Sequence, residues 1–123
     1  MPGETQGLRV LIVDDERVIA DTLALILRAR GYSVGTAYSG EEAVEAAAAQ
    51  RPDVLISDVV MGRMSGIDAA IAICGQHPEC RVILISGQSV TAELLAQATR
   101  NGHNFEVLTK PVHPQVLLDR LEA

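Results

Sequence analysis

Short apolar runs alternate with longer amphipathic segments along the whole chain. Five runs have the length and residue types of β-strands; they are residues 9–13, 33–37, 53–57, 81–85 and 105–109. The segments between them repeat apolar residues at helical spacing, as Ile19, Leu23, Ile26 and Leu27 do in the first one. Five alternating βα units predict a parallel sheet with helices on both faces.

Residues that favour helix ends support this division. Ser39 and Glu42 form a capping box ahead of the second predicted helix. The third and fourth helices are expected near 67–76 and 91–100. The dipeptide 113–114, a histidine followed by proline, is typical of the start of the fifth helix.

The five predicted strands differ in how continuous their apolar character is. Runs 9–13, 53–57 and 81–85 are continuous, as expected of strands buried on both faces. Runs 33–37 and 105–109 contain polar residues or glycine, which suits the edges of a sheet. With right-handed crossovers, the strand order 2-1-3-4-5 satisfies this ranking. The order predicts a doubly wound, flavodoxin-like α/β fold with a ligand crevice between strands 1 and 3.

Composition narrows the class of protein. The 123 residues are expected to form one domain over 8–123, preceded by a short tail at 1–7 that has no features of a signal peptide. A net charge of −6 argues against a nucleic-acid-binding surface. No apolar run reaches the roughly 20 residues of a membrane helix. Cys74 and Cys80 are expected to lie in or near the core, which fits a reducing cytoplasm.

Polar residues that could take part in binding or catalysis follow four of the predicted strands. Asp14 and Asp15 follow the first, Asp58 the third, Ser86 the fourth and Lys110 the fifth. Each is ordinary alone, because aspartate and serine are common in turns and at helix caps. Lys110, however, is the only lysine in a chain with nine arginines. All five residues are expected at the carboxyl edge of one sheet.

Three carboxylates in one crevice repel each other unless a cation cancels their charge. Mg²⁺ favours oxygen ligands from a few carboxylates together with water and phosphate. The ammonium group of Lys110 and the hydroxyl group of Ser86 suit phosphate oxygens. Such a site would let a carboxylate attack phosphorus while the metal and the lysine hold the charge of the transferred group.

Four motifs in this order resemble the receiver domain of two-component response regulators. They are "VDDE" (13–16), "SDVVMGRMSG" (57–66), "LISG" (84–87) and "LTKP" (108–111). The resemblance covers about residues 8–122, and the chain looks like a single-domain, chemotaxis-regulator-like member. It implies a module that is phosphorylated by a histidine kinase or a histidine phosphotransfer protein and later loses the phosphoryl group by hydrolysis. It also implies no enzymatic activity beyond the uptake and loss of that group.

The resemblance assigns roles by position. Asp58 matches the phosphoacceptor, and Asp14 and Asp15 match Mg²⁺ ligands, joined by Asp58 and the backbone carbonyl of Val60. Mn²⁺ is a possible substitute for Mg²⁺.

Two further residues complete the site that the resemblance implies. Ser86 would sense the phosphoryl group, and Lys110 would pair with it, with a cis bond between Lys110 and Pro111. With no further domain after the last helix, output is expected through contacts with an unidentified protein, and not through nucleic acid or membrane.

Three departures from the family pattern concern the coupling of phosphorylation to output. Gly62 stands where the family usually has proline, and Val107 stands where it usually has the switch aromatic. Phe105 lies on the same strand face as Val107, so it is either a core residue or a displaced switch. The segment 102–110 is also one residue longer than usual. Movement is therefore expected mainly in the loop 86–90 and the start of the helix that follows.

Three other functions compete with this one. A phosphatase of the haloacid-dehalogenase type needs a second acid two residues after its nucleophile, where this chain has Val60. A nucleotide or flavin binder needs a glycine-rich turn after the first strand, where this chain has acidic residues. A receiver-like scaffold that binds a partner without being phosphorylated stays open.

Overall fold

The computed structural model describes residues 8–87, 92, 96, 99–100, 102 and 105–122. The strands are β1 (Arg9–Val13), β2 (Ser33–Ala37), β3 (Val54–Asp58), β4 (Arg81–Ser86) and β5 (Glu106–Thr109). The helices are α2 (Arg17–Ala29), α3 (Gly40–Ala49), α4 (Gly66–Gln76) and α6 (Pro114–Glu122). The fourth predicted helix, near 91–100, falls largely outside the described residues.

The strands form one parallel sheet in the order β2-β1-β3-β4-β5. The predicted order and fold class are therefore confirmed. Strands β1 and β2 have the predicted bounds, β3 is shifted by one residue at both ends, and β4 and β5 each differ by one residue at one end. The two most informative differences are Asp58 and Ser86, which are the last residues of β3 and β4 and do not follow these strands.

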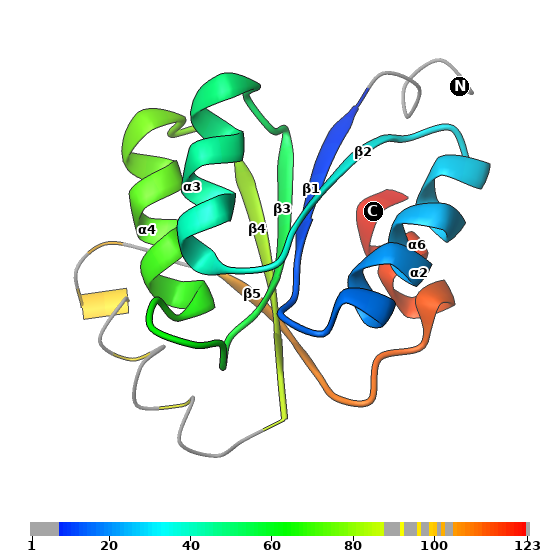
Figure 1. The fold of residues 1–123 in the computed structure, drawn as a ribbon. Coiled ribbons are helices and arrows are strands. Elements are labelled where there is room, and N and C mark those ends of the chain that lie inside the picture. Colours follow the sequence, from blue (N-terminus) through cyan, green and yellow to red (C-terminus); the bar gives the residue numbers. More distant parts are fainter. Residues whose placement is uncertain are drawn as a thin grey trace.

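Helices cover both faces of the sheet, as Figure 1 shows: α3 and α4 lie on one face, and α2 and α6 lie on the other. Alternate residues of β1 separate into the two cores. Leu11 and Val13 pack toward α3 and α4, whereas Val10 and Ile12 pack toward α2 and α6. This period-two separation explains why a strand buried on both faces must be apolar at every position.

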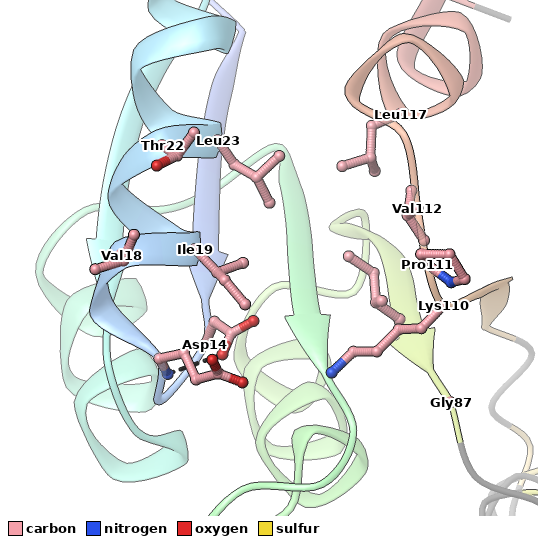
Figure 2. A pocket seen from close by; sticks show the side chains of 12 residues that line it. Asp14, Val18, Ile19, Thr22, Leu23, Gly87, Lys110, Pro111, Val112 and Leu117 are labelled. Atoms are coloured by element: carbon pink, nitrogen blue, oxygen red, sulfur yellow. Dashed lines mark hydrogen bonds between the residues drawn. The ribbon is translucent and has the colours of Figure 1, made fainter.

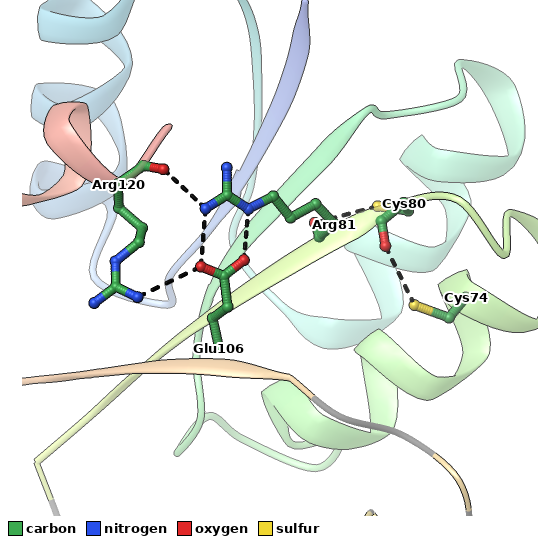
Figure 3. A network of polar contacts seen from close by, with 5 residues as sticks. All are labelled: Cys74, Cys80, Arg81, Glu106 and Arg120. Atoms are coloured by element: carbon green, nitrogen blue, oxygen red, sulfur yellow. Dashed lines mark hydrogen bonds and ion pairs between the residues drawn. The ribbon is translucent and has the colours of Figure 1, made fainter. Parts of the chain in front are cut away.

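The edge strands are less buried than the central ones, as predicted. All five residues of β3 are buried, whereas β2 alternates between exposed and partly buried residues up to the buried Ala37. In β5 only Leu108 is buried. At this edge Arg81 of β4 pairs with Glu106 of β5, with Nη2 and Oε1 2.9 Å apart, and its Nη2 also donates to the carbonyl of Arg120 (Figure 3). These contacts join α6 to the sheet.

Local capping contacts define the helix ends. The Ser39 hydroxyl accepts the amide hydrogen of Glu42 at 3.0 Å, as the capping box predicts. The Glu42 carboxylate accepts the amide hydrogen of Tyr38 at 3.2 Å. Gly31 ends α2 with φ of 96°, a conformation that glycine adopts without steric cost. His113 Nδ1 accepts the amide hydrogen of Gln115 at 3.0 Å and so caps α6.

Two further features of the chain bear on its class. Cys74 is partly buried, Cys80 is buried, and neither forms a disulfide, so the prediction that they lie in or near the core is confirmed. Within the described part of the chain, no helix combines the length and apolar character that a membrane span requires.

Candidate functional site

The five predicted site residues lie at the carboxyl edge of the sheet. Asp14 and Asp15 follow β1, Asp58 ends β3, Ser86 ends β4 and Lys110 follows β5. Because parallel strands all point the same way, these ends meet even though the residues are far apart in sequence. The structure therefore brings together residues that the sequence places on four separate strands.

Three of these residues form an acidic cluster. Asp14, Asp15 and Asp58 each place a carboxylate oxygen so that these atoms all lie within 4.8 Å of one another. Asp14 and Asp58 are only 5% and 6% exposed, whereas Asp15 is exposed. Buried like charges this close are unfavourable without a compensating cation.

The pKa of the Asp14 carboxyl group reflects this unfavourable burial of charge. Burial raises the pKa of its carboxyl group, and the charge of Asp58 raises it further. The hydrogen bond that Asp14 Oδ1 accepts from the amide of Glu16, at 2.9 Å, opposes this rise but does not cancel it. The Asp14 amide itself donates to the Ala37 carbonyl at 3.2 Å, which extends the pairing of β1 with β2. The two hydrogen bonds thus hold Asp14 in a buried position that disfavours the charged form of its carboxyl group.

Lys110 partly offsets the negative charge. Its Nζ lies 3.1 Å from Oδ2 of Asp58. Burial lowers the pKa of the Lys110 amine, but the hydrogen bond to Asp58 and the charges of Asp58 and Asp14 outweigh burial and raise it. The amine is therefore protonated and positively charged at this site. The peptide bond between Lys110 and Pro111 is cis, as the resemblance implied.

Ser86 and Val60 are the two remaining residues of the predicted site. Ser86 is buried, and its carbonyl accepts the amide hydrogen of Lys110 at 2.8 Å, which joins the ends of β4 and β5. Val60 lies two residues after Asp58, and its side chain is 55% exposed. The roles of the Ser86 hydroxyl and of the Val60 carbonyl stay predictions.

The donor set fits a hard divalent cation. The cluster offers three carboxylates and no sulfur or nitrogen ligand, which is the ligand chemistry of Mg²⁺. One carboxylate is exposed, so water and phosphate oxygens can complete the coordination. The buried charge of Asp14 and Asp58 gives the site a physical reason to take up a cation.

A groove of about 720 Å³ opens beside the site, between α2 and the segment that leads into α6. Figure 2 shows Asp14 and Lys110 on opposite sides of it, with Ile19 and Leu23 of α2 facing Leu117 of α6. The groove is charged near the strand ends and apolar along the two helices. The site is therefore reachable from solvent.

One residue of the site has a structural role that the sequence analysis did not assign. Gly66, the first residue of α4, packs so closely on β3 that a Cβ atom there would lie 2.0 Å from the carbonyl oxygen of Asp58. Its amide donates to the Val59 carbonyl at 2.8 Å. Gly66 falls inside the motif 57–66, and the glycine in that motif was the available signal.

The departures in β5 are resolved in part. Phe105 packs against the core between the sheet and α3 and α4, as a core residue would. Val107 is 36% exposed. The expected movement in the loop 86–90 and at the start of the following helix stays a prediction, because residues 88–91 lie outside the described residues.

Comparisons with known proteins agree with this geometry. The family model of the response regulator receiver domain matches residues 10–122. The transcriptional regulatory protein TcrX of Mycobacterium tuberculosis is 35% identical over 98% of this chain and 51% of its own length. The response regulator MprA of the same organism is 31% identical over 95% of this chain and 50% of its own length. The chain thus spans about half the length of these curated relatives.

Solved structures show the same fold. The chemotaxis protein CheY4 of Vibrio cholerae is 30% identical, with a TM-score of 0.82 over 94% of this chain and 97% of that one. The response regulator TrrA of Thermotoga maritima, solved in complex with Mg²⁺ and BeF, is 28% identical, with a TM-score of 0.78 over 93% and 96%. The chain belongs to the response regulator receiver domain family, the phosphorylation-dependent signalling modules of two-component systems.

Proposed function

We propose that Asp58 is the phosphoacceptor of this receiver domain and takes its phosphoryl group from a histidine kinase or a histidine phosphotransfer protein. The proposal rests on the surroundings of the Asp58 carboxylate. It is 6% exposed, lies 3.1 Å from the only lysine of the chain, and shares a cluster with Asp14 and Asp15. A nucleophilic carboxylate needs positive charge beside it to approach an anionic phosphoryl group; Lys110 supplies one such charge, and a cation held by Asp14 and Asp15 would supply another.

The transfer breaks the bond between phosphorus and nitrogen of a phosphohistidine and forms one between phosphorus and an Asp58 oxygen. The donor histidine keeps the electron pair of the broken bond and takes up a proton. The carboxylates of Asp14, Asp15 and Asp58, with the carbonyl of Val60, would hold Mg²⁺, which supplies positive charge for the phosphoryl oxygens. Mn²⁺ accepts similar oxygen ligands.

Lys110 and Ser86 bind the phosphoryl group from the ends of β5 and β4. The Lys110 ammonium, which pairs with Asp58 in the unphosphorylated chain, turns to a phosphoryl oxygen after transfer. The Ser86 hydroxyl donates a hydrogen bond to another. Water then cleaves the acyl phosphate, which restores the Asp58 carboxylate and releases phosphate. Output follows from the contacts that the phosphorylated face makes with another protein.

Exposure to acetyl phosphate and Mg²⁺, followed by intact mass measurement, tests the assignment. The wild-type chain should gain one phosphoryl group, and Asp58→Asn should gain none while remaining folded. Asp119→Asn, which alters an exposed carboxylate on α6, is the matched control and should be phosphorylated normally. Normal labelling of Asp58→Asn would contradict the choice of acceptor. Failure of the wild-type chain to gain the group would favour a scaffold that binds its partner without phosphorylation.

A further inference from the structure

An arginine at the start of α2 is close in sequence to the acidic cluster. Arg17 is the first residue of α2, where unpaired amide groups give the helix end a positive charge. The first turn of α2 contains no acidic residue to offset it. Arg17 also follows Asp15 by only two residues, and its side chain is long and flexible, so a change of side-chain conformation could bring its charge toward the site that needs a divalent cation. Whether the Arg17 charge reaches the site depends on which residue its guanidinium group contacts.

Tyr38 is that residue. The guanidinium carbon of Arg17 lies 4.2 Å from the centre of the Tyr38 ring. A cation over the face of an aromatic ring at this distance is attracted by the negative charge of the ring face. Arginine suits this contact better than lysine, because its planar guanidinium group stacks on the ring. The contact therefore gives the Arg17 charge a defined place outside the acidic cluster.

The Tyr38 ring is itself held in place by neighbouring residues. Its hydroxyl donates to Oδ1 of Asp21 at 2.7 Å, one turn along α2 from Arg17. Its amide donates to the Glu42 carboxylate at 3.2 Å, which joins it to the start of α3. The preceding residue, Ala37, accepts the amide hydrogen of Asp14. Tyr38 is thus connected to α2, to α3 and to the strand end that carries the acidic pair.

We propose that Tyr38 is a positioning residue for the divalent-cation site, and that it acts by holding the Arg17 guanidinium away from the carboxylates of Asp14 and Asp15. The inference rests on the metal site of the proposed function. Among the described residues, Lys110 is the cation that forms an ion pair with this cluster. A second cation, if Arg17 were released, would compete with Mg²⁺ for the same oxygens and weaken its binding.

Titration of Mg²⁺ into the purified chain, followed by calorimetry, measures the effect without any phosphoryl transfer. Tyr38→Leu removes the ring face but keeps an apolar side chain, and should weaken Mg²⁺ binding by about two- to fivefold, the range for an exposed ion pair. The loss should shrink at high ionic strength, since salt screens the released charge. Tyr38→Phe keeps the ring and should bind Mg²⁺ as the wild-type chain does.

The decisive variant removes the cation as well. In Arg17→Gln with Tyr38→Leu, wild-type Mg²⁺ affinity should return, because no released arginine is left to compete. If affinity stays low in this double variant, Tyr38 acts only by shaping the loop, and the proposal is overturned. Wild-type affinity in Tyr38→Leu alone would also overturn it.

A second pair of variants at an exposed position gives the same answer should Tyr38→Leu fold poorly. Arg17→Lys keeps the charge but stacks less well, and should weaken Mg²⁺ binding, whereas Arg17→Gln should not. Equal affinity in these two variants would contradict the proposal. Absence of Mg²⁺ binding in the wild-type chain is a different result, since it would refute the metal site of the proposed function itself.

Discussion

The Lys110 ammonium nitrogen lies 3.1 Å from a carboxylate oxygen of Asp58, although the two residues are 52 positions apart in the chain. The contact joins the end of β5 to the end of β3 across β4, which lies between them in the sheet. It places the one lysine of the chain where a transferred phosphoryl group would develop negative charge.

Replacement of this lysine should slow phosphorylation without unfolding the chain. In Lys110→Met, the rate of phosphoryl uptake from acetyl phosphate should fall roughly a hundredfold, the usual cost of losing one group that stabilises transition-state charge. The rate is followed by intact mass against time, and circular dichroism reports the fold. An unchanged rate would mean that Lys110 only neutralises Asp58 in the resting chain.

Metal binding should be visible as a change in stability. Because Mg²⁺ binds the folded state, Mg²⁺ at ten times its Kd should raise the free energy of unfolding by about 1.4 kcal/mol. Asp14→Ala combined with Asp15→Ala should abolish this gain. Thermal unfolding with and without Mg²⁺ provides the measurement, with Asp119→Asn as the control that keeps the gain. A full Mg²⁺ effect in the double variant would contradict the ligand assignment.

The buried thiol of Cys80 should make stability fall at alkaline pH. Burial is the main cause that raises its pKa from 9.0 to about 12, with smaller contributions from Cys74 and Asp53. The folded state therefore holds the thiol proton more tightly than the unfolded state does. The resulting stabilisation is complete below pH 9 and is lost as pH rises toward 12.

Cys80→Ala should flatten this part of the stability curve by up to about 1.4 kcal/mol per pH unit, the slope that one proton gives. Denaturant unfolding at a series of pH values measures the slope, which is separate from the constant packing loss caused by the smaller side chain. Burial also raises the pKa of Cys74, whose sulfur lies 3.9 Å from the Cys80 carbonyl oxygen (Figure 3), so Cys74→Ala should change the slope in the same direction. A slope unchanged by Cys80→Ala would show that the thiol ionises freely.

Gly62, in the loop after β3, and Gly66, the first residue of α4, should respond in opposite ways to alanine. In Gly66→Ala the new Cβ atom would lie 2.0 Å from the Asp58 carbonyl oxygen, so the backbone that carries the acceptor must move. We expect a loss of about 3 kcal/mol in the free energy of unfolding. A Cβ atom added at Gly62 would meet no atom within 4 Å, and the φ of Gly62 is not positive. Gly62→Ala should therefore be neutral or gain about 0.4–1 kcal/mol.

Denaturant unfolding of the two variants gives both values. Similar losses at the two positions would show that the loop, and not the close approach of Gly66 to β3, limits stability.

Much of the fold and the membership of the site could be predicted from the sequence. Continuous apolar runs identified the central strands, and polar residues in 33–37 and 105–109 identified the edges, because burial on one or two faces leaves a local pattern. Once the strands were known to be parallel, Asp14, Asp58 and Lys110 had to share one edge of the sheet. That inference depends only on strand direction, which the alternation with helices reveals.

The packing of α2 shows where a local pattern is insufficient. The spacing of Ile19, Leu23, Ile26 and Leu27 predicted an apolar helix face. Leu27 is buried, and Leu23 and Ile26 pack against the core while partly buried, but the other fully buried residues of α2 are the small Ala20 and Ala24. Ile19 is 38% exposed on the groove beside the site. Small alanines let the helix approach the sheet closely, so residues that hydrophobicity alone would not select form part of its buried face.

The sequence by itself determined the order of the elements, the edges of the sheet and the residues at its carboxyl end. Only the tertiary structure decided which atoms meet there: the bond from Lys110 to Asp58, the approach of Gly66 to the Asp58 carbonyl, and the stacking of Arg17 on Tyr38. The physical reason is that periodicity records which side of an element is buried, whereas a contact of about 3 or 4 Å depends on how separate elements are rotated and spaced against one another.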